Sequence, residues 1–129
     1  MNALATAAIA LTLTGLYYSF CILPFTTTRV TYLKDKIRDI IGFTNFEIIP
    51  SQGQAYTLNK KFIYMDLSEH YTDQDLLRVL IHEVSHCLCS DVGHTDSFRD
   101  IEESILKRAR EMKLLDHDLI PSSYPCYGQ

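Results

Sequence analysis

Cysteine, basic charge and repeated sequence are all scarce in this chain of 129 residues. Its four cysteines are too few for the dense disulfide framework of small secreted domains. Its 12 lysines and arginines are outnumbered by 16 aspartates and glutamates, so no broad nucleic-acid interface is expected. No collagen period, heptad array or internal repeat is present. A hydrophobic fraction of 47% excludes global disorder. The length is sufficient for one small domain.

Charged side chains are also absent from residues 1–28, and Arg29 is the first. The apolar run over residues 3–25 is long enough to cross a hydrocarbon core of about 30 Å as a helix. We therefore predict a transmembrane anchor over residues 1–28, which contacts the lipid bilayer through residues 3–25. A cleaved signal peptide and a buried soluble helix are the alternatives. A signal peptide normally begins with a basic n-region, which this sequence lacks. A soluble helix normally has a polar face, which this apolar run also lacks.

The orientation of this anchor follows from the charges that flank it. Only the α-amino group precedes the apolar run, whereas Arg29, Lys34, Lys36 and Arg38 follow it closely. The positive-inside rule then predicts a single-pass membrane protein whose C-terminal domain, residues 29–129, lies in the cytosol.

The first part of that domain combines a helix with short strands. Apolar residues at helical spacing predict an amphipathic helix over Tyr32 to Ile41, ended by Gly42. The run Phe46 to Ile49 is a candidate strand, stopped by Pro50. Two further apolar runs flank residues 59–61 and predict a hairpin, with arms over residues 55–58 and 62–67.

Two helices complete the predicted domain. Thr72 is a good N-cap for a core helix from about Asp73 to Leu88. A polar loop and a second helix from about Ser97 to Leu114 follow. The stripe expected to be buried on this second helix comprises Phe98, Ile101, Ile105, Ala109 and Met112. Strands and helices in separate runs predict an α+β fold.

An H-E-x-x-H motif lies on the predicted core helix, formed by His82, Glu83 and His86. The i, i+4 spacing places both imidazoles on one helix face, where they can bind one zinc ion. Zinc acidifies a water molecule, and Glu83 is near enough to take the proton of that water as a general base. Cys87 and Cys89 adjoin the motif, but i, i+2 spacing directs their thiols apart, so we expect them to be buried structural residues.

A third zinc ligand is expected beyond the helix. His94 lies eight residues after His86, behind a glycine that permits a turn, and histidine is the commonest metal ligand. A carboxylate from the second helix, Glu102 or Glu103, is the alternative. Two loop carboxylates are weaker candidates, and the second of them is also a candidate to orient a ligand imidazole: Asp91 and Asp96.

The stretch HEVSHCLCSDVGHTDSF over residues 82–98 resembles the Wss1-like (WLM) metallopeptidases and, more distantly, the SprT-like proteases. In those families a third zinc-binding histidine follows the H-E-x-x-H helix, and a phenylalanine matching Phe98 comes shortly after it. The sequence is most similar to small metallopeptidases predicted in large double-stranded DNA viruses. That similarity includes a hairpin like residues 57–60 and a Pro-rich tail, and it covers roughly residues 31–128.

The resemblance implies a minimal zincin-like fold with His82, His86 and His94 as ligands of Zn²⁺ and Glu83 as general base. Many relatives cleave proteins crosslinked to DNA. We do not transfer that substrate, because this chain is net acidic and has a predicted membrane anchor. The expected function is a membrane-anchored zinc metalloendopeptidase, in a host membrane or a virion internal membrane, that acts on a protein or peptide. The edge of the sheet, for which residues 62–67 are our candidate, would align an extended peptide.

Two parts of this expectation have alternatives. A non-catalytic virion or membrane structural protein would use the same ligands for stability alone, although it has no need of Glu83. A cytosolic binding module requires that the first 28 residues are not inserted in a membrane. For the donor that stabilises the oxyanion we favour Tyr124, with Tyr127 and His117 as further candidates in the tail.

Overall fold

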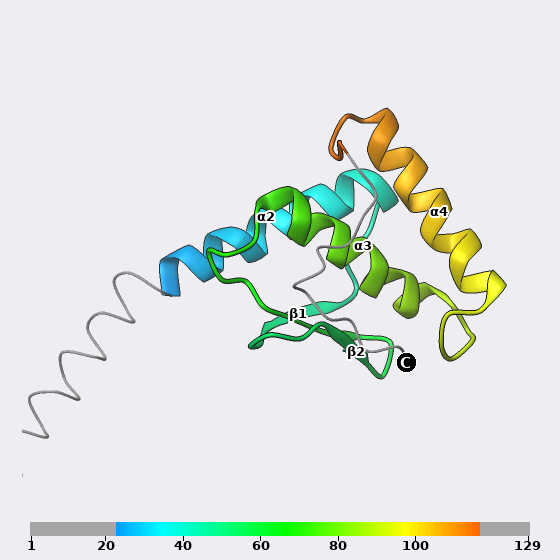
Figure 1. The fold of residues 1–129 in the computed structure, drawn as a ribbon, viewed down its shortest axis with the longest axis horizontal. Helices are drawn as coiled ribbons and strands as arrows, with labels where there is room; N and C mark the ends of the chain where they lie inside the picture. The colour runs from blue at the N-terminus through cyan, green and yellow to red at the C-terminus, as the bar shows by residue number, and fades with distance from the viewer. Residues whose placement is uncertain (1–22, 117–129) are drawn as a thin grey trace, which may run out of the picture.

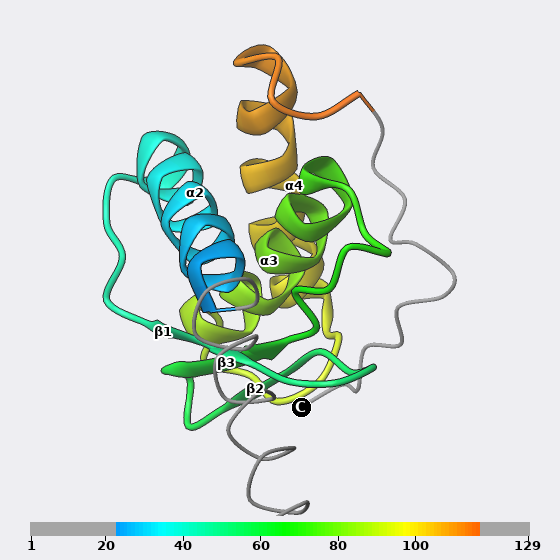
Figure 2. The same cartoon turned by 90° about the vertical axis from the view of Figure 1, so that its left-hand side faces the viewer.

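The computed structural model describes residues 23–116 and contains an α+β fold within them. Three helices lie on one side of a small mixed sheet of three strands (Figures 1 and 2). Most of the predicted anchor and the tail with Tyr124 lie outside the described residues. The elements follow one another as α2 (Leu23–Ile41), β1 (Glu47–Pro50), β2 (Tyr56–Leu58), β3 (Phe62–Met65), α3 (Asp73–Leu88) and α4 (Asp96–Glu111).

The sheet has the strand order β1-β3-β2. On one side of β3, Ile63 pairs with Ile48 of β1 in a parallel ladder. On its other side the same residue pairs with Thr57 of β2 in the predicted antiparallel hairpin. β3 is therefore the central strand, and the prediction that residues 62–67 form an edge is wrong. Within the described residues, the edges of the sheet are β1 and β2.

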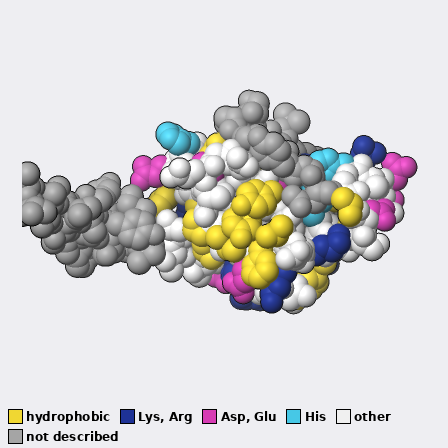
Figure 3. All heavy atoms as spheres, turned by 90° about the horizontal axis from the view of Figure 1, so that it is seen from below, with side chains coloured by type: hydrophobic (Ala, Val, Ile, Leu, Met, Phe, Trp, Pro, Cys, Tyr) yellow, Lys and Arg dark blue, Asp and Glu magenta, His cyan; other side chains and the backbone are white. Residues whose placement is uncertain are grey.

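The two faces of the sheet differ, because successive side chains of a strand point to opposite faces. Ile48, Ile63 and Met65 are buried against the helices. The opposite face carries a contiguous hydrophobic patch, which Figure 3 shows from below. On this face the paired Tyr56 and Tyr64 stack their rings at a centroid distance of 4.5 Å.

Helix α2 ends at Ile41 as predicted, but it is already helical at Leu23 rather than starting at Tyr32. Gly42 has a φ of 88° and its amide donates to the carbonyl of Arg38, so it closes the last turn. The predicted boundary between residues 28 and 29 falls inside this helix, and the division into anchor and domain stays a prediction. Across residues 23–116, no helix combines the length and the apolar character that a membrane span requires.

Helix α3 has the predicted bounds and N-cap. The Thr72 side chain accepts from the amide of Asp75, whose carboxylate accepts from the amide of Thr72 in return. This capping box fixes the start of the helix. The helix lies between the sheet and the other two helices, and every residue from Leu76 to His86 is buried.

Helix α4 is slightly displaced from its predicted bounds. Thr95 is its N-cap, because the Thr95 hydroxyl accepts from the amide of Phe98. Its end at Glu111 precedes the predicted Leu114, since the chain turns at Lys113 with a φ of 58°. Met112 is therefore a 39% exposed C-cap residue, and Ile101 is only partly buried, so the buried stripe comprises Phe98, Ile105, Leu106 and Ala109.

Candidate metal centre

The C-terminal half of α3 carries the first two histidines of the candidate site. His82 and His86 lie one turn apart, with a ring centroid distance of 5.1 Å. Only 7% of His82 and 2% of His86 are exposed. Both imidazoles lie on one face of the helix, because side chains four residues apart are stacked one turn above the other, as the motif predicts.

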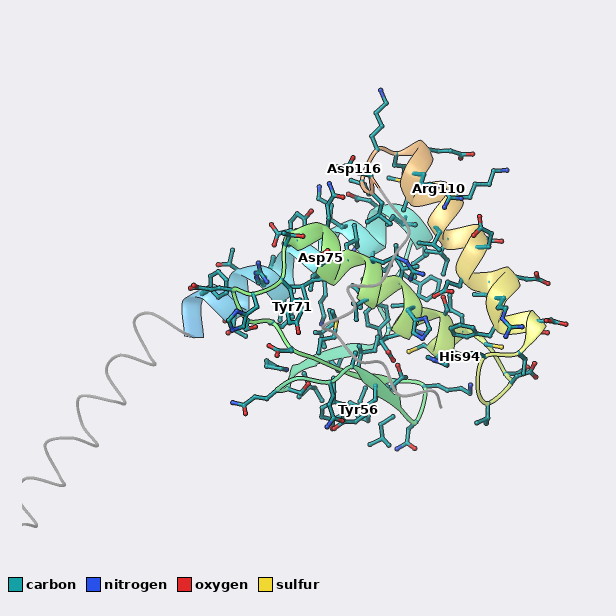
Figure 4. The ribbon with its side chains drawn as sticks, viewed as in Figure 1. Tyr56, Tyr71, Asp75, His94, Arg110 and Asp116 are labelled. Carbon is teal, nitrogen blue, oxygen red and sulfur yellow. The ribbon has the colours of Figure 1, made fainter. Side chains whose placement is uncertain are left out.

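His94 comes from the loop between α3 and α4 and reaches the same place (Figure 4). The preceding Gly93 has a φ of 84°, a conformation that favours glycine. The Nε2 atoms of His94 and His82 are 3.1 Å apart, and one ring nitrogen of each of the three histidines lies within 4.8 Å of the others. Two nitrogens bound to one tetrahedral zinc are about 3.3 Å apart, so this cluster can hold a metal ion.

The chemistry of His86 also fits a metal ligand. Among the described residues, its buried Nε2 has no hydrogen-bond partner. Burial, followed by the neighbouring His82 and His94, lowers the pKa of His86 to about 4. Burial and His82 also lower the pKa of His94. Neutral imidazoles with an unpaired nitrogen are the form that binds metal ions.

Glu102 of α4 lies behind His82. Its Oε2 is 2.6 Å from Nδ1 of His82 and 3.2 Å from Nη1 of Arg78. Burial favours the neutral acid, but the hydrogen bonds and charges of His82 and Arg78 outweigh it, so the pKa of Glu102 is lowered. A carboxylate on Nδ1 fixes the orientation of the imidazole and leaves Nε2 for a metal.

The other carboxylates considered from the sequence lie elsewhere. Glu103 points outward, where its carboxylate pairs with Arg110 at 2.8 Å. The orienting role expected for Asp96 is wrong, since its side chain is 98% exposed and pairs with Arg99. Asp91 accepts a hydrogen bond from the hydroxyl of Thr95 and so stays within the loop.

Phe98 packs against all three histidines. Its ring centroid is 5.1 Å from that of His82, 4.3 Å from that of His86 and 5.0 Å from that of His94. The side chain is 1% exposed and thus forms an apolar wall of the cluster. Helical spacing predicts its burial, and the family resemblance marks it as part of the site.

Glu83 lies next to the histidines but points toward the sheet. Its side chain is fully buried, and its Oε2 accepts a hydrogen bond of 2.6 Å from Oγ1 of Thr57 in β2. The same hydroxyl is 3.2 Å from the backbone carbonyl of Glu83. Thr57 lies in the hairpin that the family resemblance includes, but its bond to Glu83 was not predicted, because it depends on how the hairpin packs under the helix.

A cavity of about 210 Å³ opens between the hairpin and the loop. It lies beside His86 and is bounded by Thr57 and Lys60 on the hairpin side and by Asp91 and Val92 on the loop side. Val92 is 77% exposed, so the cavity is accessible from the surface. This cavity leads from solvent to the buried histidine.

The two cysteines beside the motif stay outside the cluster. Cys89 is buried and Cys87 half-buried, and neither forms a disulfide within the described residues. Burial, reinforced by the charge of Glu83, raises the pKa of Cys87 to about 12. A thiol with such a pKa is protonated and unreactive at neutral pH, which agrees with the structural role predicted from spacing.

Comparison with known proteins identifies relatives in iridescent viruses. The chain is 41% identical over 80 residues to Uncharacterized protein 042R of Invertebrate iridescent virus 3, a match that covers 58% of this chain and 50% of the relative. It is 31% identical over 70 residues to Uncharacterized protein 136R of Invertebrate iridescent virus 6, covering 49% of this chain and 39% of the relative. The chain thus spans half or less of the length of these curated relatives. No protein-family model and no solved structure matches it. The chain is similar to uncharacterized proteins of iridescent viruses, and its described part contains three histidines that can hold a metal ion.

Proposed function

We propose that this chain is a zinc-dependent metallopeptidase of the Wss1-like type. The observation that carries the proposal is the convergence of His82, His86 and His94, with their candidate ligand atoms within 4.8 Å. Two of these histidines belong to an H-E-x-x-H helix, and the viral origin of the relatives agrees with the family resemblance.

Each residue of the site has a distinct part in this proposal. His82, His86 and His94 hold Zn²⁺, which supplies Lewis-acid activation of water and of the scissile carbonyl. Glu83 takes the proton of the attacking water and returns it to the leaving amine. Thr57 holds the Glu83 carboxylate through the bond of 2.6 Å, and Tyr124 remains the proposed oxyanion donor.

The proposed substrate is an unfolded protein segment or a peptide. β2 is an edge strand within the described residues, and it carries Thr57 next to the cavity beside His86. An extended peptide paired with β2 would lie across that cavity. We further propose that residues 3–25 anchor the chain in a host or virion membrane, with residues 29–129 in the cytosol.

One observation favours a second candidate, a zinc-stabilised structural protein without turnover. Glu83 is fully buried and already bonded to Thr57, as expected of a group that only maintains packing. In that case the metal would stabilise the link between α3 and the loop carrying His94.

Glu83→Gln separates the two functions. The full chain in detergent micelles is loaded with zinc and incubated with fluorescently labelled, unfolded casein. The amide cannot accept a proton, so we expect cleavage to fall by about 100-fold or more while the zinc content stays the same. The control is Glu103→Gln, which changes an exposed carboxylate outside the site and should leave cleavage unchanged.

Equal cleavage by wild type and Glu83→Gln would remove Glu83 from the mechanism. A wild-type chain that retains zinc and cleaves nothing would instead support the structural protein.

A further inference from the structure

The tip of the β2–β3 hairpin is held in an unusual backbone conformation. Asn59 and Lys60 have φ values of 54° and 53°, in the left-handed region. Asparagine tolerates this region well, and lysine is less common in it. Two such residues in succession form the kind of turn that closes a tight hairpin, and the amide of Lys61 donates to the carbonyl of Leu58 across it at 3.2 Å.

From the tip of this turn, the side chain of Lys60 reaches the end of α3. Its Nζ donates to the carbonyls of His86 and Asp91, both at 3.2 Å, and to the carbonyl of Cys89. The ammonium group has three donors, and all three are directed at backbone oxygens between 26 and 31 residues away. Lys60 thus connects the hairpin with the end of α3.

These three carbonyls span the junction between the two parts of the metal site. His86 is itself a proposed ligand, Cys89 is the C-cap of α3, and Asp91 lies three residues before His94. The last carbonyls of a helix have no partner within it, and they attract a cation because the helix dipole is negative there. Lys60 therefore fixes where the loop leaves the helix and the direction in which it starts.

We propose that Lys60 is a positioning residue that holds the His94 loop, residues 89–95, in its metal-binding conformation. This inference rests on the proposed metal site. Asp91 is held from both sides, because its carbonyl accepts from Lys60 and its carboxylate accepts from Thr95 at 2.8 Å. Lys60 acts through His94 and touches neither the metal ligand atoms nor the reacting groups.

The test is metal affinity and the visible absorption spectrum of the cobalt-substituted full chain in detergent. Lys60→Met keeps the length of the side chain and removes its donors. We expect it to lower cobalt and zinc affinity by about 10- to 100-fold, the usual effect of losing a group that orients a ligand. Its cobalt spectrum should shift toward that of His94→Ala. The matched control is Lys61→Met, since the neighbouring Lys61 lies over the Phe62 ring at the surface, and its affinity should stay within about twofold of wild type.

A double variant distinguishes positioning from general stability. In the His94→Ala background, Lys60→Met should lower metal affinity by no more than about a further twofold, because the ligand that Lys60 positions is already missing. An equal loss in both backgrounds would overturn the inference. If Lys60→Met does not fold, Lys60→Arg provides the test. Its planar fork cannot converge on three carbonyls, so affinity should fall at least about threefold, whereas Lys61→Arg should leave it unchanged.

Wild-type affinity in both Lys60→Met and Lys60→Arg would also overturn the inference. Failure of the proposed metal site can be distinguished from failure of this inference, because the wild-type chain would then bind neither cobalt nor zinc at these histidines.

Discussion

The two parts of the candidate metal centre are built in opposite ways. His82 and His86 lie on α3, a buried helix whose start is fixed by its own neighbours in sequence. His94 lies on an exposed loop, which is held by side chains from the hairpin and from α4. The comparison teaches that a motif on a helix specifies half of a site by itself, while the other half depends on tertiary contacts.

The largest expected effect is on the free energy of unfolding, from a substitution in α3, the helix that carries His82 and His86. Leu80→Ala removes a fully buried side chain from the middle of α3 and should lower the free energy of unfolding by about 2–5 kcal/mol. Val92→Ala, in the 77% exposed loop, should change it by less than about 0.5 kcal/mol. Denaturant unfolding of the full chain measures both. Similar losses in the two variants would show that the loop belongs to the folding core.

The next effect separates metal binding from folding. The free energy of zinc binding at a site with four ligands is about 10–16 kcal/mol, so each ligand contributes roughly a quarter of it. Removing one ligand by His94→Ala should therefore weaken zinc binding by roughly 100- to 1,000-fold. The stability of the metal-free protein should barely change, because the loop contributes little to the core. Competition with a chromophoric chelator measures the affinity, and the exposed His70→Ala is the control. Full affinity in His94→Ala would exclude it as a ligand.

A smaller loss of zinc affinity is expected from changing Glu102, the carboxylate that orients His82. Glu102→Gln keeps the shape but removes the charge that orients His82, so zinc affinity should fall by about 10- to 100-fold. Glu103→Gln, one residue along α4, should have no effect because its carboxylate faces solvent. The same titration measures both variants. A complete loss of zinc in Glu102→Gln would indicate that this carboxylate is itself a ligand.

The smallest effect is a pH dependence of the metal-free protein. The pKa of His86 is about 4 when folded and about 6.5 when unfolded, so only the unfolded chain takes up its proton between these values. The lowered pKa of Glu102 acts in the same direction at lower pH. The thermal midpoint should therefore drop as pH falls from about 6.5 to 4, by at least roughly 4–8 °C. His86→Gln should flatten this slope, whereas a slope that is unchanged would place His86 in a solvated environment.

Local signals in the sequence account for what could be predicted. Thr72 and Asp75 determine the start of α3 through neighbours three residues apart, and Gly42 determines the end of α2 through its own φ. The i, i+4 spacing places His82 beside His86 without any tertiary information. His94 could be named because one turn suffices to bring it back to the helix end.

The rest depends on how distant segments pack. The central position of β3 follows from pairing with β1, which no alternation within the strand reveals. Glu102 could be named as a carboxylate of the site, but its bond to Nδ1 of His82 depends on where α4 passes α3. The family resemblance includes residues 57–60, but it assigned no role to Thr57 or Lys60, because a hydroxyl and an ammonium on a hairpin acquire their roles only under a particular helix.

The central claim is that the three histidines form one metal site. Its most direct test is the zinc content of the full chain after gel filtration in detergent, compared with His82→Ala, His86→Ala and His94→Ala. The account predicts one zinc per wild-type chain and strongly reduced zinc in each variant, whereas a chain without zinc, or zinc retained equally by all three variants, would contradict it.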